Sequence, residues 1–191
     1  MTLAGVRNTP LPELEALVRS SGYFRQKAAR LKMFVAFLDE RYGGSLTRMF
    51  SRPTEKLRQE LLELKGVGPE TADSILLYAG QHPVFVVDSY TRRILERHGI
   101  CSPGARYEEI RAMFENALRR EVGPSPAKIP EGGAIYIHPA SPMSLAKRSS
   151  VTQIYNDMHG LIVQAGKNYC LKSRALCEMC PLREFLPRVK D

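Results

Sequence analysis

Apolar side chains recur every three or four residues along most of the chain, which is the spacing of amphipathic helices. The segment Phe24–Tyr42 shows the pattern best: its apolar stripe lies opposite a face that carries Arg25, Lys27, Arg30 and Lys32. Similar stripes predict further helices over Pro12–Ser20, Pro53–Leu64, Pro69–Ala79, Ser89–His98, Arg106–Val122 and Val151–Gly166. The pattern therefore predicts an all-α chain.

Glycines, prolines and one serine mark where these helices begin and end. The pair Gly43-Gly44 ends the longest helix, and Ser51 is expected to cap the helix that has Pro53 in its first turn. Val84–Val87 is apolar throughout but short, so it is either a strand or a buried extended entry to the next helix. The stretch Gly123–Ser150 is rich in Pro, Gly and Ser and has no helical period, which predicts a loop or flexible insertion.

Composition and charge narrow the class of protein. The chain has 191 residues, 43% hydrophobic and 25% charged, enough for one compact domain or two small helical ones. It has no apolar run of membrane-spanning length and no signal peptide, so we expect a cytoplasmic protein with its four cysteines as thiols or metal ligands. The net charge of +8 suits a nucleic-acid partner, although an ordinary basic surface gives the same balance.

Two closely spaced glycines separate two predicted helices in the run Leu64-Lys65-Gly66-Val67-Gly68-Pro69-Glu70-Thr71-Ala72. Glycine allows positive φ and leaves backbone amides uncovered, and the following helix begins with unpaired N–H groups. These groups together favour an anion such as a nucleic-acid phosphate. The simpler interpretation is a plain turn between helices, where glycine is also common.

Asp88 follows the apolar run directly, in Val86-Val87-Asp88-Ser89-Tyr90. This position places a carboxylate at the edge of a core. Aspartate before a helix is also a favoured N-cap, worth roughly 1 kcal/mol. The two roles are compatible, because a capping carboxylate can still present one oxygen to a cleft.

These two runs, in this order and spacing, carry a family resemblance. Leu64–Gly68 with Thr71-Ala72-Asp73, followed by Asp88 with Thr91-Arg92-Arg93, resembles the helix–hairpin–helix, Gly/Pro-rich loop and Asp motif of the endonuclease III (HhH-GPD) superfamily of DNA glycosylases. The similarity extends from about Leu11 to Pro187, except over the loop. It implies an all-α, two-lobed fold, with lobes over residues 1–82 and 83–191.

The resemblance also implies a function: a monomer that removes a damaged base from double-stranded DNA. Such a base is flipped out of the duplex, and Asp88 would stabilise the positive charge that develops on the sugar. The residues expected to grip the DNA are Lys65, Gly66, Val67, Gly68 and Thr71. The candidates for stacking on the flipped base are Tyr23, Tyr78 and Tyr90, although aromatic residues of helices are more commonly core.

Glu70 departs from the pattern of the bifunctional members of this family. They carry a lysine at this position, which forms an imine with the sugar. A carboxylate cannot form an imine, so we expect hydrolysis of the base without lyase chemistry. Glu70 and its neighbours resemble the 3-methyladenine glycosylase III branch, which implies an alkylated base. Glu70 itself either complements the positive end of the helix or contacts the base or water.

Three cysteines, Cys170, Cys177 and Cys180, have a metal-ligand spacing near the end of the chain. The resemblance implies a [4Fe–4S] cluster, but the family's fourth cysteine is Leu186 here. The alternatives are a cluster completed by a non-protein ligand or by Cys101, a zinc ion with a histidine such as His98, and a site that holds no metal.

A second departure lies at the start of the chain. Family members usually have one more helix before the segment that resembles Leu11–Arg41, and we expect that helix to be missing here. Its loss would expose an apolar face of Phe24–Tyr42. Two rival functions therefore stand beside hydrolysis: a DNA-binding remnant that cleaves nothing, and a bifunctional glycosylase/lyase.

Overall fold

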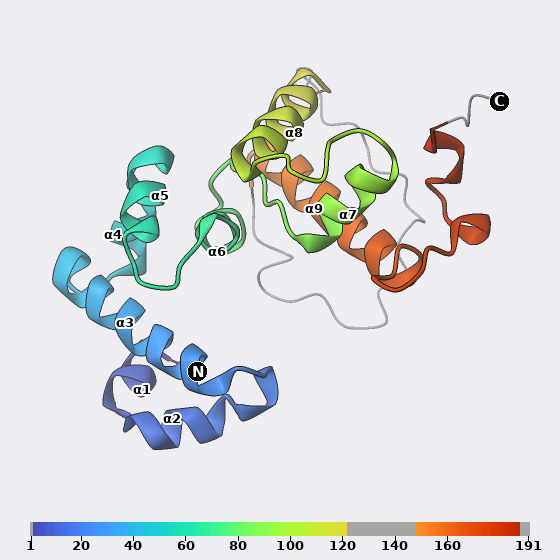
Figure 1. Ribbon diagram of the computed structural model, residues 1–191. Helices are drawn as coiled ribbons and strands as arrows, with labels where there is room; N and C mark the ends of the chain where they lie inside the picture. The colour runs from blue at the N-terminus through green and yellow to red at the C-terminus, as the bar shows by residue number, and fades with distance from the viewer. Residues whose placement is uncertain (1, 122–147, 188–191) are drawn as a thin grey trace. The chain divides into compact units, whose positions relative to one another are not determined.

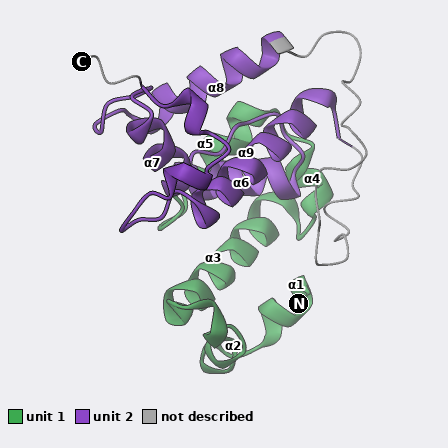
Figure 2. Ribbon diagram, turned by 90° about the vertical axis from the view of Figure 1, so that its right-hand side faces the viewer, with its two compact units in different colours: residues 1–68 green, residues 69–191 purple. Residues whose placement is uncertain are grey.

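A computed structural model describes residues 2–121 and 148–187 (Figure 1). The described part is all-α, as predicted, and its only extended pairing is an isolated bridge between Cys170 and Ala175. The chain forms two compact units, residues 1–68 and 69–191 (Figure 2). The lobe boundary expected near residue 82 stays a prediction. No described helix has the length and apolar character needed to cross a membrane.

The first unit is organised around α3 (Phe24–Tyr42), whose bounds match the predicted helix. Gly43 ends it in a left-handed conformation, and the amides of Gly43 and Gly44 bond back to Asp39 and Leu38. The other elements of this unit are α1 (Leu3–Asn8), α2 (Leu11–Leu17), a 3₁₀ turn (Arg19–Ser21), α4 (Leu46–Phe50) and α5 (Thr54–Leu62).

Helices α1 and α2 cover the apolar face of α3. Val6 of α1 and Leu14 of α2 are buried together with Ala28 and Val35 of α3, and α1 and α2 both pack against α3. The predicted exposure of this face is therefore wrong. The sequence pattern did not indicate α1, because six residues are too short to show a helical period.

The predicted Ser51 cap is also wrong. The Ser51 hydroxyl instead donates to the carbonyl of Arg48 at the end of α4, and Pro53 precedes α5 without a side-chain cap. The short helix α4 occupies the segment between α3 and α5 and uses Ser45 as its own N-cap. Ser51 therefore ends α4 and does not cap α5.

The second unit contains the remaining helices. They are α6 (Pro69–Ser74) with a π-helical continuation (Ile75–Ala79), α7 (Ser89–Arg97), α8 (Tyr107–Glu121), α9 (Ser150–Asn168) and 3₁₀ turns at Cys177–Met179 and Arg183–Phe185. Helix α9 packs against α7, α8 and the π-helical turn (Figure 1). Nearly all of the predicted loop Gly123–Ser150 lies outside the described residues.

Candidate active site

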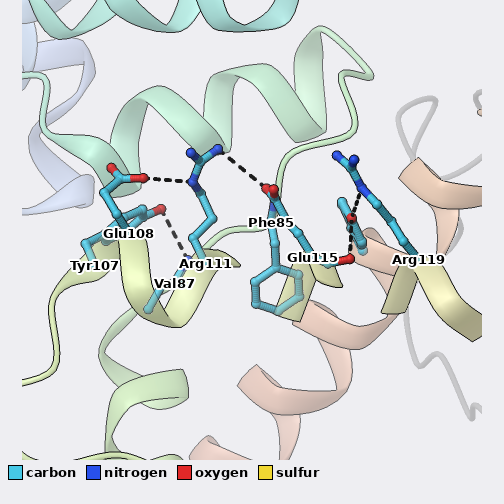
Figure 3. A network of polar contacts seen from close by, with 8 residues as sticks. Phe85, Val87, Tyr107, Glu108, Arg111, Glu115 and Arg119 are labelled. Carbon is cyan, nitrogen blue, oxygen red and sulfur yellow. Dashed lines mark hydrogen bonds and ion pairs between the residues drawn. The ribbon is translucent and has the colours of Figure 1, made fainter. Parts of the chain in front are cut away.

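Asp88 directly follows an extended, fully buried segment, Val84–Val87. Of the two predicted alternatives, the structure has the extended entry to a helix rather than a strand. Without a neighbouring strand, its inward amides need other acceptors. The amide of Phe85 donates to Glu115 Oε1 at 3.0 Å and that of Val87 donates to the Tyr107 hydroxyl at 3.3 Å, both from α8 (Figure 3).

Charged side chains of α8 contact one of these acceptors, Glu115 (Figure 3). Arg111 lies 2.9 Å from Glu108 and 3.5 Å from Glu115. Burial raises the pKa of the Glu115 carboxyl, although the Phe85 amide and Arg111 oppose the shift. The Phe85 ring stacks on Phe114 of the same helix, with centroids 4.2 Å apart. Both the backbone and a side chain of the extended segment are therefore fixed against α8.

Asp88 is the N-cap of α7, so the capping role predicted from the sequence is confirmed. Its Oδ1 accepts hydrogen bonds from the Thr91 amide at 2.8 Å and the Thr91 hydroxyl at 3.0 Å. The Asp88 side chain is 13% exposed to solvent. Burial raises the pKa of this carboxyl, but the His159 imidazole and the two Thr91 donors outweigh burial and lower it below its ordinary value. Asp88 is thus held as a carboxylate.

The second oxygen of Asp88 faces a buried histidine that the sequence pattern did not single out. His159 Nε2, on α9, lies 3.6 Å from Asp88 Oδ2, and the side chain is only 9% exposed. On its other side, His159 Nδ1 is hydrogen-bonded to the Tyr78 hydroxyl. Burial, and then the charge of Asp88, raise the pKa of Tyr78 to about 12. Tyr78, His159 and Asp88, from three separate parts of the chain, therefore form a continuous series of contacts.

Glu70, in the first turn of α6, is a second carboxylate, and it interacts electrostatically with Asp88. Burial and the negative charge of Asp88 raise its pKa, while His159 and Arg92 oppose the rise. The two acids thus have pKa values shifted in opposite directions, an arrangement common where carboxylates take different roles in catalysis. Glu70 is solvent-exposed, whereas Asp88 is largely buried.

The predicted hairpin turn lies at the end of the first unit. The amide of Val67 donates to the carbonyl of Leu64 at 2.9 Å, and Gly66 has a φ of +83° that L side chains rarely adopt. Gly68 has no such constraint: a Cβ built on it meets nothing within 4 Å. Of the two glycines, Gly66 uses the positive φ that glycine permits and Gly68 does not. The bare face of Gly68 leaves its backbone open to an approaching group.

Beside this turn, the first unit has an open groove lined by both basic and apolar side chains. The lining residues are Gln26, Ala29, Arg30, Met33, Lys65 and Gly66. The Arg30 guanidinium lies so close to Gly66 that a Cβ there would stand 2.7 Å from Nε. Val67 is partly buried and Thr71 is exposed in the first turn of α6. The turn thus presents positive charge next to uncovered backbone.

The three cysteines line one cavity in the second unit, together with Leu186, Arg97 and His98. Arg97 Nη1 donates to Cys170 Sγ at 3.2 Å and to the carbonyl of Leu171 at 2.8 Å, which ties this segment to the end of α7. Cys101 does not line the cavity. No three His, Cys, Asp or Glu side chains among the described residues converge as ligands of one ion.

Comparisons with known proteins show the family to which this fold belongs. Residues 1–120 match the family model described as HhH-GPD superfamily base excision DNA repair protein. The chain belongs to this superfamily. It is 36% identical over 94% of its length to a provisionally named DNA repair glycosylase of Methanocaldococcus jannaschii, and 33% identical over 59% to endonuclease III of Bacillus subtilis. It spans 68% and 46% of those two proteins.

A solved structure gives the same fold. The chain is similar to the H. pylori 3-methyladenine DNA glycosylase bound to 1,N6-ethenoadenine, with a TM-score of 0.68 and 27% identity. The match covers 86% of this chain and 66% of that one. The family resemblance and the all-α HhH-GPD fold expected from the sequence are therefore confirmed.

Within this family fold, the three candidate stacking tyrosines have different surroundings. Tyr78 is partly buried and contacts His159 beside Asp88. Tyr90 packs on α9, so close to Gly166 that a Cβ on that glycine would lie 2.4 Å from its ring, and the Arg93 guanidinium lies 5.0 Å from the ring centroid. Tyr23 belongs to the first unit, is 82% exposed and has a φ of +46°. Of the three, Tyr78 is the one with a contact to His159 beside Asp88.

His159 is the residue that sequence reasoning missed. It lies on the same face of α9 as the buried Tyr155 and Ile162, at the spacing of a core-facing helix position. The available signal was a titratable side chain on an otherwise apolar stripe. That signal alone did not say which residue it would meet, because its partners Tyr78 and Asp88 are distant in sequence.

Proposed function

We propose that this chain hydrolyses the N-glycosidic bond of a damaged base in double-stranded DNA, with Asp88 as the catalytic carboxylate. The observation that carries the proposal is a largely buried, ionised carboxylate at the start of a helix, with two Thr91 donors at Oδ1 and the His159 imidazole facing Oδ2. Membership of a base excision repair family supports the substrate class.

The chemistry needs a fixed negative charge near the sugar. As the bond between C1′ and the base nitrogen breaks, its electron pair leaves with the base and positive charge grows on the sugar ring. Asp88 stabilises that charge, and it accepts the proton of the water that attacks C1′. The extended segment held by α8 and the capping contacts with Thr91 keep the carboxylate in position while charge develops.

Glu70 supports hydrolysis without an imine. A carboxylate at this position supplies no amine to the sugar, so no covalent intermediate forms through it. We also propose an alkylated base as the substrate. The support is the similarity to the H. pylori 3-methyladenine glycosylase, whose structure holds 1,N6-ethenoadenine.

The hairpin turn supplies the grip on DNA in this proposal. The open backbone at Gly68 and the nearby Lys65 suit a phosphate, which carries no sequence information. The net charge of +8 adds a general attraction for the duplex.

We propose that the cavity lined by Cys170, Cys177 and Cys180 holds a [4Fe–4S] cluster, with Leu186 in place of the family's fourth cysteine. Ligands of one zinc ion lie about 2.3 Å from the metal and within about 4 Å of one another, a convergence that the described side chains do not have. Cysteine thiolates hold [4Fe–4S] clusters, and the three thiols that line this cavity would supply three of the four ligands. The cluster would tie the last described segment together.

One experiment separates the proposal from its rivals. Base release is measured on duplexes that each carry one lesion, with alkylated purines, oxidised pyrimidines and deaminated bases in the panel, and with borohydride present or absent. We expect release of alkylated purines and no trapped protein–DNA complex. Glu70→Lys is the matched variant, because only there does an amine replace the carboxylate. Trapping of the wild-type protein would support the bifunctional reaction, and binding without release on any lesion would support the DNA-binding remnant.

A further inference from the structure

His159 is a buried titratable side chain beside Asp88, and one of its nitrogens lies beyond hydrogen-bond distance of every described polar atom. Among the described residues, His159 Nε2 is buried and has nothing within hydrogen-bond distance. Its nearest charged atom is Asp88 Oδ2 at 3.6 Å. A buried polar atom without a partner is costly in a folded protein, so each such atom calls for an explanation.

The position of the ring proton follows first from the carboxylate that Nε2 faces, because Asp88 Oδ2 only accepts hydrogen bonds and Nε2 must carry the proton to interact with it. Tyr78 keeps its hydroxyl proton over the whole physiological range, since burial and Asp88 raise its pKa to about 12. When that hydroxyl donates to His159 Nδ1, the neutral imidazole must carry its own proton on Nε2. That N–H then faces Asp88. A doubly protonated ring presents the same N–H.

The surrounding structure leaves the ring little freedom to turn. The Phe85 ring meets it edge-on with centroids 6.3 Å apart, and the Tyr78 ring lies 5.8 Å away. Helix α9 is itself fixed near its start, where the Thr152 hydroxyl donates to the carbonyl of Gln81 at 3.2 Å. The close approach of α7 to α9 depends on Gly166, whose missing side chain makes room for the Tyr90 ring. The imidazole is therefore a rigid support rather than a mobile side chain.

We propose that His159 is a positioning residue for Asp88: its Nε2–H orients Oδ2 while Thr91 orients Oδ1, and Tyr78 fixes the histidine tautomer that makes this possible. The proposal deepens the proposed function, since it assigns a support to the catalytic carboxylate. It makes Tyr78 a support of His159 rather than a stacking platform. The other charged groups acting on this site are Glu70 and Arg92.

Two conservative variants separate this role from simple packing. In His159→Gln the amide nitrogen replaces Nε2 and keeps a donor toward Asp88, while the contact with Tyr78 is lost. In His159→Asn the shorter amide replaces Nδ1 and keeps the Tyr78 contact, while the donor toward Asp88 is lost. Both variants remove the ring, so a packing role predicts similar losses in both.

We expect single-turnover base release to fall about tenfold or more in His159→Asn and by a smaller factor in His159→Gln. The difference between the two variants should disappear in an Asp88→Asn background, because no carboxylate is left to hold. Tyr78→Phe should slow release by a few-fold, with Tyr42→Phe as the matched control, since Tyr42 loses a similar hydroxyl contact with Glu60 in the first unit. Equal losses in the two His159 variants would overturn the proposal.

A second readout does not depend on activity. The titration of the Asp88 carboxyl is followed by carbon NMR in the full-length protein with and without each His159 substitution, and thermal unfolding confirms that each variant is folded. We expect the midpoint to rise by about one pH unit in His159→Asn and much less in His159→Gln. Unchanged midpoints in both would refute the proposal even in a protein that releases bases. Shifted midpoints with full activity in Asp88→Asn would instead refute the catalytic role of Asp88.

Discussion

The two ends of α7 carry the two candidate functional regions, and they are built differently. At its start, Asp88 accepts hydrogen bonds from Thr91 and faces the imidazole of His159. At its end, Arg97 reaches a segment of short turns whose three cysteines surround a cavity. In the first region, the groups that surround the carboxylate are all side chains and backbone amides of the described chain. The second has three thiols and a leucine where a fourth ligand would bind.

This difference indicates which region is stabilised by packing within the protein and which depends on a bound ligand. Burial around Asp88 comes from helices α8 and α9, which pack their apolar faces on the extended segment. The cysteine segment has little regular structure and exposes Met179 and Phe185. A segment with few buried apolar contacts has low local stability unless a ligand binds it. We therefore expect the two ends to respond independently to substitution.

The largest effect is expected from Asp88→Asn. Asparagine keeps the size and still caps α7, but it removes the negative charge from the start of the helix. Single-turnover base release should fall by about 100-fold or more, with DNA binding unchanged or tighter. Release is measured with enzyme in excess, alongside affinity for an intact duplex. A variant that releases bases at the wild-type rate would reduce Asp88 to a cap and remove the distinction between the two ends.

The next largest effect concerns iron at the other end of the helix. Protein purified without oxygen should be yellow-brown, and Cys177→Ser should lose nearly all of its iron because only two thiols remain at the cavity. Cys101→Ser is the matched control and should retain its iron, since Cys101 does not line the cavity. Leu186→Cys should hold iron more tightly. Iron content and absorbance are the measurements, and a colourless wild-type protein without iron would leave the site without a cluster.

A smaller effect is expected from Gly68→Val in the hairpin turn of the first unit. Its side chain points into open space, so the fold is spared while an approaching phosphate is blocked. Affinity should fall about tenfold for any duplex, with or without a lesion, because a lost charged hydrogen bond costs about 1.5–3 kcal/mol. Gly104→Val is the control, since a Cβ there also meets nothing within 4 Å. Equal affinities for the two variants in low salt would argue against the hairpin grip.

The smallest effect is the pH dependence of stability. The pKa of Asp88 lies below its ordinary value of 3.8, so its contribution is present above pH 3.8 and is lost as pH falls through the lowered value. The pKa of Glu70 lies above its ordinary 4.5, so its ionised form opposes folding and the sign is reversed.

Chemical denaturation near neutral pH and near pH 3 tests these signs. Asp88→Asn should be destabilising by about 1 kcal/mol at neutral pH and less destabilising near pH 3, whereas Glu70→Gln should be neutral or slightly stabilising at neutral pH. A loss in Asp88→Asn that stays the same at both pH values would show that the carboxylate charge does not contribute to stability.

Much of the fold was readable from local pattern. The apolar period and the Gly43-Gly44 pair predicted α3 with the right bounds, because a long amphipathic helix and a left-handed glycine are local properties. Asp88 was predicted both as a cap and as a candidate catalytic residue from the five residues around it, and the cap is confirmed. Short helices such as α1 and α4 were missed, because five or six residues hold too little of the helical period.

The sequence by itself determined the helical class, the family, the hairpin turn and the carboxylate, since each is written in a few consecutive residues or one regular spacing. Only the tertiary structure decided that His159 of α9 and Tyr78 of the π-helical turn line up on Asp88, and that Leu186 joins the three cysteines around one cavity. Those meetings depend on how α9 packs against α7 and on the side chain that Gly166 lacks. Such packing sums many weak contacts between residues far apart in the chain, and no local pattern records them.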